Sequence, residues 1–313
     1  MMARNLNGVL VLDKPKDISS TEAVEKIKKI LRVRKAGHGG TLDPFATGVL
    51  PICIGKGTKI AQFILEGDKV YEGCFELGIV TDTYDLTGEV IEKNPVPELS
   101  AEEIGKVMEG FLGIIEQVPP PYSAAKYKGR PLYKWARKGI KIEKKPKKVE
   151  ILKFRLKKFE SPRVYFEVYC SKGTYVRSLI HEVGQRLNCG AVLIELRRIR
   201  KGPFTIEEAL AFEEIEKLAQ EERLMEKIIS PAEALSFIPA VTISTSMAQR
   251  IRQGRPVSLN VLGNLIKLQK VPRKHRVPWL RIVTEEGDLV AVTYYPEKLS
   301  GDGWAEMLRV FVS

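Results

Sequence analysis

A single carboxylate, Asp43, lies in the glycine-rich stretch GHGGTLDPFATGVLPICIGKGTK, residues 37–59. The stretch has six glycines in 23 residues, and its other ionisable side chains are His, Lys and Cys. Glycine permits positive φ, and the residue before Pro44 is disfavoured in helical backbone, so a structural turn is the simplest interpretation. The alternative is that Asp43 is a reactive group held in a rigid loop.

Several common chemistries do not match this stretch. A phosphate-binding P-loop needs GxxxxGK[ST], but here Gly55 and Lys56 are followed by another glycine. The nucleophile elbow of the hydrolases is missing. Glycoside hydrolysis uses two carboxylates, and Asp43 has no second acid near it in sequence. A lone carboxylate would suffice for a rearrangement at a nucleoside's glycosidic bond in which nothing leaves and no water is consumed.

Composition favours a nucleic acid as the partner. The chain of 313 residues has 51 Lys and Arg against 39 Asp and Glu, a formal net charge of +12 that attracts polyanions. The four cysteines form no CxxC pair and the three histidines are dispersed, so neither disulfides nor a metal site is predicted. No segment approaches the roughly 20 apolar residues of a membrane-spanning helix, so we expect a cytoplasmic protein with no membrane partner.

The segments around the glycine-rich stretch predict an α+β fold, in which a mixed, largely antiparallel central sheet has flanking helices. Apolar or alternating runs indicate strands, and Ser followed three residues later by Glu indicates a capped helix start. The predicted strands are 8–12, 69–79, 149–159, 163–170 and 193–204. Helices are predicted after Ser19 and Ser100 and over 176–187.

The chain is expected to divide near residue 235. There a polar helical stretch over 206–229 gives way to short strands and turns from Thr242 onwards. The first domain, 1–234, would carry a basic insertion at about 122–158. The second, 235–313, is predicted to be a compact β-rich module that either binds a partner or only stabilises the fold.

The basic segment is the strongest indication of an RNA-binding surface. Residues 125–159 hold fifteen Lys and Arg against two Glu, with aromatic residues interleaved that could stack on unpaired bases. A solvated charged face is the alternative, but like charges at this density repel unless a polyanion relieves them. The candidate contacts to the RNA backbone are Lys126, Lys128, Arg130, Lys144, Lys145, Lys147 and Lys148.

Five segments, in order, resemble the signature segments of the TruB family, the bacterial tRNA pseudouridine-55 synthases. They are GVLVLDKPKDISS, GHGGTLDPFATGVLPICIGKGTK, DKVYEGCFELGIVTDTYDLTGEV, PPYSAAKYKGRPLYKWAR and SKGTYVRSLIHEVG. Linked motifs of this length are far more specific than one short motif. The resemblance implies the pseudouridine synthase fold, and the tail resembles, more diffusely, a PUA module, a small RNA-binding β-barrel.

The activity that the resemblance implies is isomerisation of uridine 55 in the T loop of tRNA. It implies no cofactor, no metal and no guide RNA, and a monomer that binds the T stem-loop. Two rival interpretations stay open. One is a guide-RNA-dependent synthase of the dyskerin-like branch, which the LPICIGKGTK ending and the long basic segment disfavour. The other is an RNA chaperone, an activity that could also accompany catalysis.

The resemblance also implies roles for single residues. Asp43 would be the catalytic aspartate, Tyr71 the tyrosine that stacks on the target uracil and assists loss of its C5 proton, and Arg177 the partner of the aspartate. The substrate-binding or loop-supporting residues would be His38, Lys59, Tyr175, Leu196 and Lys14. From the residues alone, Tyr71 also suits a core position, and a cation at a helix start such as Arg177 calls for a nearby carboxylate.

The substrate sets the order of events. A uridine inside a folded loop must be flipped out to reach a carboxylate, and the basic surface offsets the lost stacking. Asp43 would then open the glycosidic bond by attack at the sugar, attack at the base or abstraction of a ribose proton. The sequence leaves all three routes open.

Overall fold

The computed structural model describes residues 6–123, 126–127, 130–131, 145–272, 277–296 and 303–311. Their largest sheet has nine strands, in the order β1-β3-β12-β4-β11-β10-β7, with β2 beside β3 and β13 beside β12. The strands are β1 (Gly8–Lys14), β2 (Ala36–His38), β3 (Thr47–Ile54), β4 (Lys69–Leu77), β7 (Gly113–Gln117), β10 (Lys147–Glu160), β11 (Arg163–Cys170), β12 (Ala191–Lys201) and β13 (Phe204–Thr205). Only the β3–β12 pair is parallel among these described strands, so the predicted fold class is confirmed.

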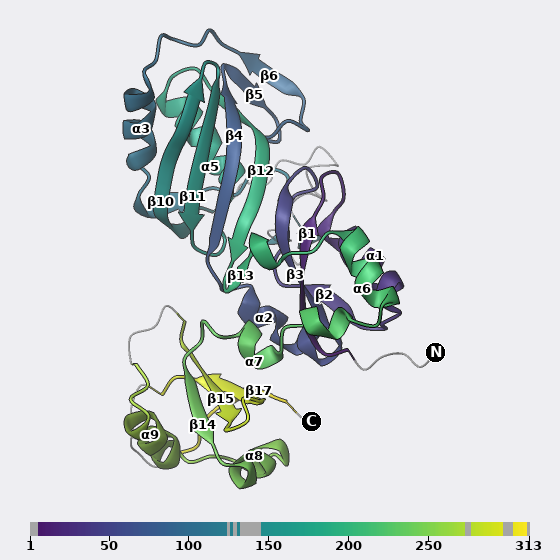
Figure 1. The fold of residues 1–313 in the computed structure, drawn as a ribbon. Coiled ribbons are helices and arrows are strands. Elements are labelled where there is room, and N and C mark those ends of the chain that lie inside the picture. The colour runs from purple at the N-terminus through teal and green to yellow at the C-terminus, as the bar shows by residue number, and fades with distance from the viewer. Residues whose placement is uncertain are drawn as a thin grey trace.

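Helices cover one face of this sheet. In Figure 1, α5 (Val176–Arg186) lies behind the strands of this sheet, and α3 (Ala101–Glu109) lies at its edge beside β10. Alternating strand residues such as Phe154 and Phe166 point into this layer and are buried there. Capping boxes start α1 (Ser20–Leu31) and α3, as the Ser-x-x-Glu spacing predicts.

The parallel contact between β3 and β12 brings the glycine-rich loop to the centre of the sheet. Gly48 pairs with Arg198 there, at a φ of 101°. A Cβ at Gly48 would lie only 2.3 Å from the carbonyl oxygen of Arg198. Glycine therefore permits the close approach of the two strands, and residues 39–46 are carried beside β12 and β4.

Two small sheets complete the first part of the chain. The strands β5 (Ile79–Thr81) and β6 (Val90–Lys93) form one, and β8 (Lys126–Tyr127) and β9 (Arg130–Pro131) form the other. The short helices η1 (Gly55–Ile60) and α2 (Ala61–Ile64) follow β3.

The structure corrects the predicted end of the basic insertion. From Lys147 onwards the residues belong to β10, which pairs with both β7 and β11 inside the central sheet. Val149, Ile151 and Phe154 are buried, whereas Lys147, Lys148 and Arg155 on either side of them are exposed. The last part of the predicted basic insertion is therefore an amphipathic strand. The strand predicted over 149–159 is present as β10.

The predicted helical stretch 206–229 is helical in part, because it is divided into three short helices. It forms η2 (Ile206–Glu208), α6 (Phe212–Gln220) and η3 (Leu224–Lys227). Between the first two, the amide of Leu210 donates to the carbonyl of Val11 on β1 at 3.0 Å. After α6, Glu222 adopts a φ of 62°. Pairing with β1 and this left-handed residue interrupt the helical path.

The tail contains helices that the sequence prediction missed. Its sheet is ordered β14 (Ala240–Ile243), β15 (Trp279–Thr284), β16 (Leu289–Tyr294) and β17 (Met307–Val310). The helix α7 (Pro231–Ala234) precedes it, and α8 (Thr245–Arg252) and α9 (Leu259–Leu268) follow β14. Both α8 and α9 have Ser N-caps but lack a capping box, which hid them from a search for Ser-x-x-Glu.

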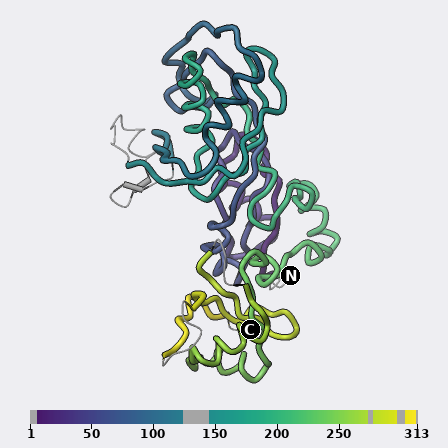
Figure 2. The backbone as a smooth tube through the Cα atoms, turned by 90° about the vertical axis from the view of Figure 1, so that its left-hand side faces the viewer, coloured from purple at the N-terminus to yellow at the C-terminus, as the bar shows by residue number. Residues whose placement is uncertain are grey.

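The tail sheet packs against the first part of the chain through apolar side chains. The rings of Phe63 on α2 and Trp279 on β15 meet edge to face, with centroids 4.9 Å apart. Val283 and Leu289 join the same buried cluster as Val9 on β1. Figure 2 shows this tail at one end of an elongated molecule. Among the described helices, none has the length and apolar character needed to cross a membrane.

Candidate active site

Asp43 and Arg177 form the ion pair that the sequence predicts. The Arg177 Nε atom lies 2.9 Å from Asp43 Oδ2, and Arg177 Nη2 donates to Asp43 Oδ1 at 3.0 Å. The guanidinium is buried in the first turn of α5, whereas the Asp43 side chain keeps 34% of its surface exposed. The ion pair at Nε and the hydrogen bond from Nη2 hold one side of the carboxylate, and Asp43 also lines the cavity.

A second carboxylate, Asp85, which was not predicted from the sequence, contacts the same guanidinium. Asp85 Oδ2 lies 3.2 Å from Arg177 Nη1, and the Asp85 side chain is buried. The same Nη1 donates to the carbonyl of Thr83 at 3.2 Å, and Nη2 donates to the carbonyl of Tyr122 at 2.9 Å. Arg177 therefore joins the glycine-rich loop to two other segments, 83–85 and Tyr122.

Burial and charge act in opposite directions on Asp43. Removal from water raises the pKa of Asp43 above its usual value, and the nearby Asp85 charge adds to that rise. The Arg177 guanidinium lowers the pKa of Asp43 by its charge and its hydrogen bond, and so favours the carboxylate. The reactivity of Asp43 is thus set by the balance between these three influences.

Lys14 and Ser20, in the segment GVLVLDKPKDISS, hold the glycine-rich loop in place. Lys14 is fully buried, and its Nζ donates to the carbonyls of Pro15 at 2.7 Å, Ile18 at 2.8 Å and Pro44 at 3.1 Å. Ser20 Oγ exchanges hydrogen bonds with the backbone of Leu42 at 2.8 and 3.1 Å. The residues on both sides of Asp43 are therefore anchored.

The buried position of Lys14 is electrostatically unfavourable for its charged form. Burial lowers its pKa to about 8, although the charges of Asp17 and Asp43 oppose the change. Its carbonyl partners lie in the segment before α1 and at Pro44, so Lys14 joins that segment to the loop.

Arg198 on β12 ties the same loop to the tyrosine. It is fully buried, and it donates to the carbonyls of Val49 at 2.8 Å, Gly40 at 3.0 Å and Thr41 at 3.3 Å. Tyr71 on β4 is also buried, and it is directly opposite Arg198 in the pairing of β4 with β12. Desolvation raises the pKa of Tyr71 to about 12, so its phenol keeps the proton at neutral pH.

These groups meet at a cavity of about 500 Å³. Asp43 and Arg177 lie in its wall, and Tyr71, Tyr175 and Leu196 give it aromatic and apolar surfaces. Its mixed polar and apolar lining is typical of a small-molecule or nucleoside pocket. Five of the residues predicted to be catalytic or substrate-binding therefore line the same cavity.

The rim of this cavity is basic. Lys147 and Lys148, both exposed on β10, contribute to its lining together with Lys69 and Lys172. Lys172 forms an ion pair with Glu66, which lies in the same lining. Cations around the mouth of a pocket suit a ligand that brings phosphates with it.

Other predicted residues lie elsewhere. His38, on β2, accepts a hydrogen bond at Nδ1 from the amide of Gly40 at 3.4 Å, and burial lowers its pKa, so its imidazole is neutral at neutral pH. Lys59 is half-buried in η1, and neither it nor His38 nor Lys14 is among the residues that line the cavity. Lys145 is exposed beside β10. Lys128 and Lys144 lie outside the described residues, as do the side chains of Lys126 and Arg130.

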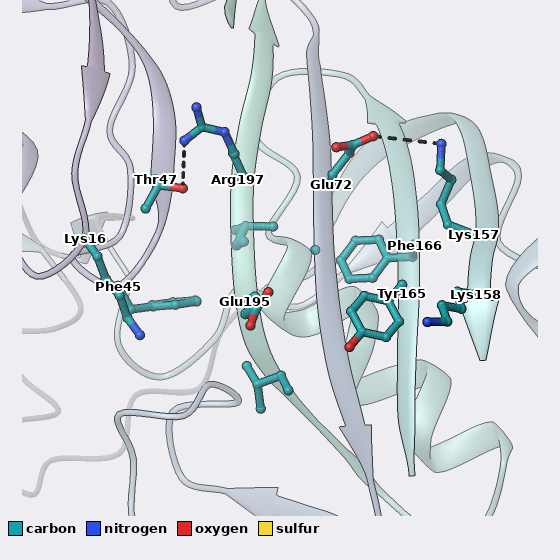
Figure 3. A pocket seen from close by; sticks show the side chains of 13 residues that line it. Lys16, Phe45, Thr47, Glu72, Lys157, Lys158, Tyr165, Phe166, Glu195 and Arg197 are labelled. Atoms are coloured by element: carbon teal, nitrogen blue, oxygen red, sulfur yellow. Dashed lines mark hydrogen bonds and ion pairs between the residues drawn. The ribbon is translucent and has the colours of Figure 1, made fainter. Parts of the chain in front are cut away.

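A second cavity, of about 610 Å³, opens where β3 and β12 diverge (Figure 3). Glu72, Glu195 and Lys157 point into it, and Lys157 lies 3.9 Å from Glu72. Arg197 also lines it and is held by Asp13 and Thr47. Neither Asp43 nor Arg177 lines this space, so the smaller cavity is the better candidate for the reaction. Within the described chain, no three His, Cys, Asp or Glu side chains gather as a metal site.

Comparison with known proteins identifies the family. The N-terminal domain of the TruB family pseudouridylate synthases matches residues 28–176, and the tRNA pseudouridylate synthase B C-terminal domain matches residues 177–236. The tRNA pseudouridine synthase B of Nitrosococcus oceani is 42% identical over 90% of this chain and 88% of its own. That of Syntrophus aciditrophicus is 40% identical over 98% of this chain and 99% of its own.

A solved structure extends the comparison to the fold. A chain in the crystal structure of a Cbf5-Nop10-Gar1 complex superposes with a TM-score of 0.77 at 28% identity, over 98% of this chain and 85% of that one. The chain described here belongs to the TruB family of pseudouridylate synthases. It is an isomerase that converts uridine to pseudouridine in tRNA.

Proposed function

We propose that the enzyme isomerises uridine 55 in the T loop of tRNA, and that Asp43 carries out the reaction. One observation carries the proposal: the Asp43 carboxylate, held on one side by Arg177, faces a cavity lined by Tyr71 and Leu196. A carboxylate, an aromatic ring and an apolar wall are what a flipped uracil nucleoside requires. The other side of the carboxylate is free to reach the nucleoside.

Tyr71, Asp43 and Arg177 have different roles in the proposed reaction. Tyr71 stacks on the uracil, and with a pKa of about 12 it acts in the resting enzyme as a neutral phenol. Asp43 opens the glycosidic bond, the base turns within the cavity, and C5 bonds to the ribose. Arg177 keeps Asp43 charged and oriented at a position where burial favours the neutral acid. Attack at the sugar, attack at the base and abstraction of a ribose proton all begin from this carboxylate.

The basic rim binds the nucleotides around the target. Lys147 and Lys148 are exposed beside the cavity, where a flipped nucleotide would bring its phosphates. A second domain, starting near residue 235, adds affinity for tRNA through its own surface. The enzyme acts as a monomer on the T stem-loop and needs no guide RNA.

The test uses the purified protein alone with an unmodified tRNA transcript. Pseudouridine is mapped at every uridine after incubation, and a transcript with cytidine at position 55 is the matched control. We expect pseudouridine at position 55 alone, and none in the control transcript. Modification at another uridine, or modification only after a guide RNA is added, would overturn the proposal.

A further inference from the structure

Tyr84 adopts an unusual backbone conformation beside the active site. Its φ is 64°, in the left-handed region that non-glycine residues avoid because Cβ crowds the following carbonyl. Its ring stacks on that of His181 on α5, with centroids 3.8 Å apart and planes 8° from parallel. A bulky residue held in this region indicates that its surroundings stabilise it enough to offset the strain.

The two neighbours of Tyr84 both contact Arg177. The Thr83 carbonyl accepts from Arg177 Nη1 at 3.2 Å, and the Asp85 carboxylate lies 3.2 Å from the same nitrogen. His181 follows Arg177 by four residues, so both side chains lie on the same side of α5. The stack and the ion pair therefore join the same loop to the same helix, one turn apart.

Other contacts hold Asp85 but do not reach α5. Its Oδ1 accepts from Thr83 Oγ1 at 2.9 Å and from the amide and hydroxyl of Thr87 at 2.9 and 2.5 Å. The backbone at Asp85 pairs with Leu193 of β12. These bonds shape the turn and attach it to the sheet, and they leave Oδ2 for Arg177.

The chemistry of the two rings suits a stack. Burial lowers the pKa of His181 and raises that of Tyr84, so both rings are uncharged at neutral pH. His181 Nδ1 is buried without a hydrogen-bond partner in the described part of the chain. Because that nitrogen has no hydrogen bond among the described residues to orient the ring, we attribute the orientation of the imidazole to its stacking on Tyr84.

We propose that Tyr84 and His181 are positioning residues for the isomerisation. Their stack fixes segment 83–85 against α5, so that Asp85 holds Arg177 and Arg177 presents Asp43 to the nucleoside. The inference rests on the proposed catalytic role of Asp43.

The experiment separates stacking from folding. Tyr84→Gly relieves the backbone strain and removes the ring, and His181→Ala removes the other half of the stack. Tyr84→Phe and His181→Phe are the matched controls, because each keeps an aromatic pair. For every variant, the single-turnover rate at saturating enzyme, the Kd for unmodified tRNA and the thermal midpoint are measured. The Tyr84→Gly change is repeated in an Asp85→Asn background.

We expect Tyr84→Gly and His181→Ala to lower the single-turnover rate about 2- to 10-fold, the range for loss of one aromatic pair. The Kd should stay within about twofold, because neither residue lines the cavity, and both Phe variants should retain the wild-type rate. In the Asp85→Asn background Tyr84→Gly should lower the rate no further, because its effect passes through Asp85.

Two results would overturn the inference. One is a wild-type rate in folded Tyr84→Gly and His181→Ala variants, and the other is an equal effect of Tyr84→Gly with and without Asp85. An Asp43→Asn variant measured in parallel separates the two proposals. If that variant is inactive, either result refutes the stack alone; if it turns over normally, the proposed function fails and the inference fails with it.

Discussion

Replacing Arg177 by lysine tests whether the geometry of the guanidinium, beyond its charge, supports catalysis. The guanidinium has five polar contacts: an ion pair and a hydrogen bond with Asp43, an ion pair with Asp85, and hydrogen bonds to the carbonyls of Thr83 and Tyr122. An ammonium has three donors and no planar fork, so it cannot form at least two of these bonds. Hydrogen bonds to charged groups are worth about 1.5–3 kcal/mol each, which places the destabilisation at roughly 3–6 kcal/mol.

If that destabilisation falls on the reacting geometry, turnover drops about 10²- to 10⁴-fold. The acid limb of the rate profile should also move to higher pH. Arg177 lowers the pKa of Asp43, so a weaker partner lets that pKa rise, and the reactive carboxylate is protonated earlier as pH falls.

The assay is release of tritium from tRNA labelled at uridine C5, under single-turnover conditions from low to neutral pH, with filter binding for affinity. Arg163→Lys is the matched control, because Arg163 is 58% exposed on β11. A folded Arg177→Lys enzyme within tenfold of the wild-type rate, with an unmoved acid limb, would refute the reasoning.

Two further changes test the surroundings of the pair. Asp85→Asn removes a like charge that raises the pKa of Asp43, so the acid limb of the rate profile should shift to lower pH. The rate at neutral pH should fall, because Arg177 loses a buried charged partner. A shift of the acid limb to higher pH in the same tritium assay would contradict this. Lys147→Gln combined with Lys148→Gln should flatten the slope of log K against log salt by about 1.4, or roughly 0.7 for each phosphate that is no longer neutralised. Lys227→Gln with Lys217→Gln, on exposed residues of the 206–229 stretch, is the control, and an unchanged slope in the cavity-rim variant would make those lysines solvated surface only.

Sequence patterns predicted the parts of the fold in which local and tertiary preferences agree. The strands and the capped helices α1 and α3 combine clear periodicity with a clear start signal. The 206–229 stretch has helical composition, but pairing with β1 at Leu210 interrupts it. A contact with a strand so distant in the sequence leaves no local signal.

The candidate site shows the same division. The partnership of Asp43 with Arg177 follows from the motifs and from the need of a buried cation for a carboxylate. Asp85 lies in the segment DKVYEGCFELGIVTDTYDLTGEV but was not predicted to have a role, because only the folded loop brings it to Arg177. The five donors of a guanidinium were the available signal, since one carboxylate cannot satisfy them all. The burial of Arg198 was likewise not predictable, because in the sequence it is one of four basic residues in LRRIRK; in the structure it is fully buried.

Asp43→Asn tests the central claim most directly. Asparagine keeps the size of the side chain and its acceptor oxygen, and it is among the best residues for a glycine-rich turn, so a purely structural role would tolerate it. A role at the nucleoside would not, because the negative charge and the reactive oxygen are gone. We predict no tritium release from C5-labelled tRNA by the folded variant, with tRNA affinity retained in parallel filter binding. Substantial tritium release by that variant would remove Asp43 from the mechanism.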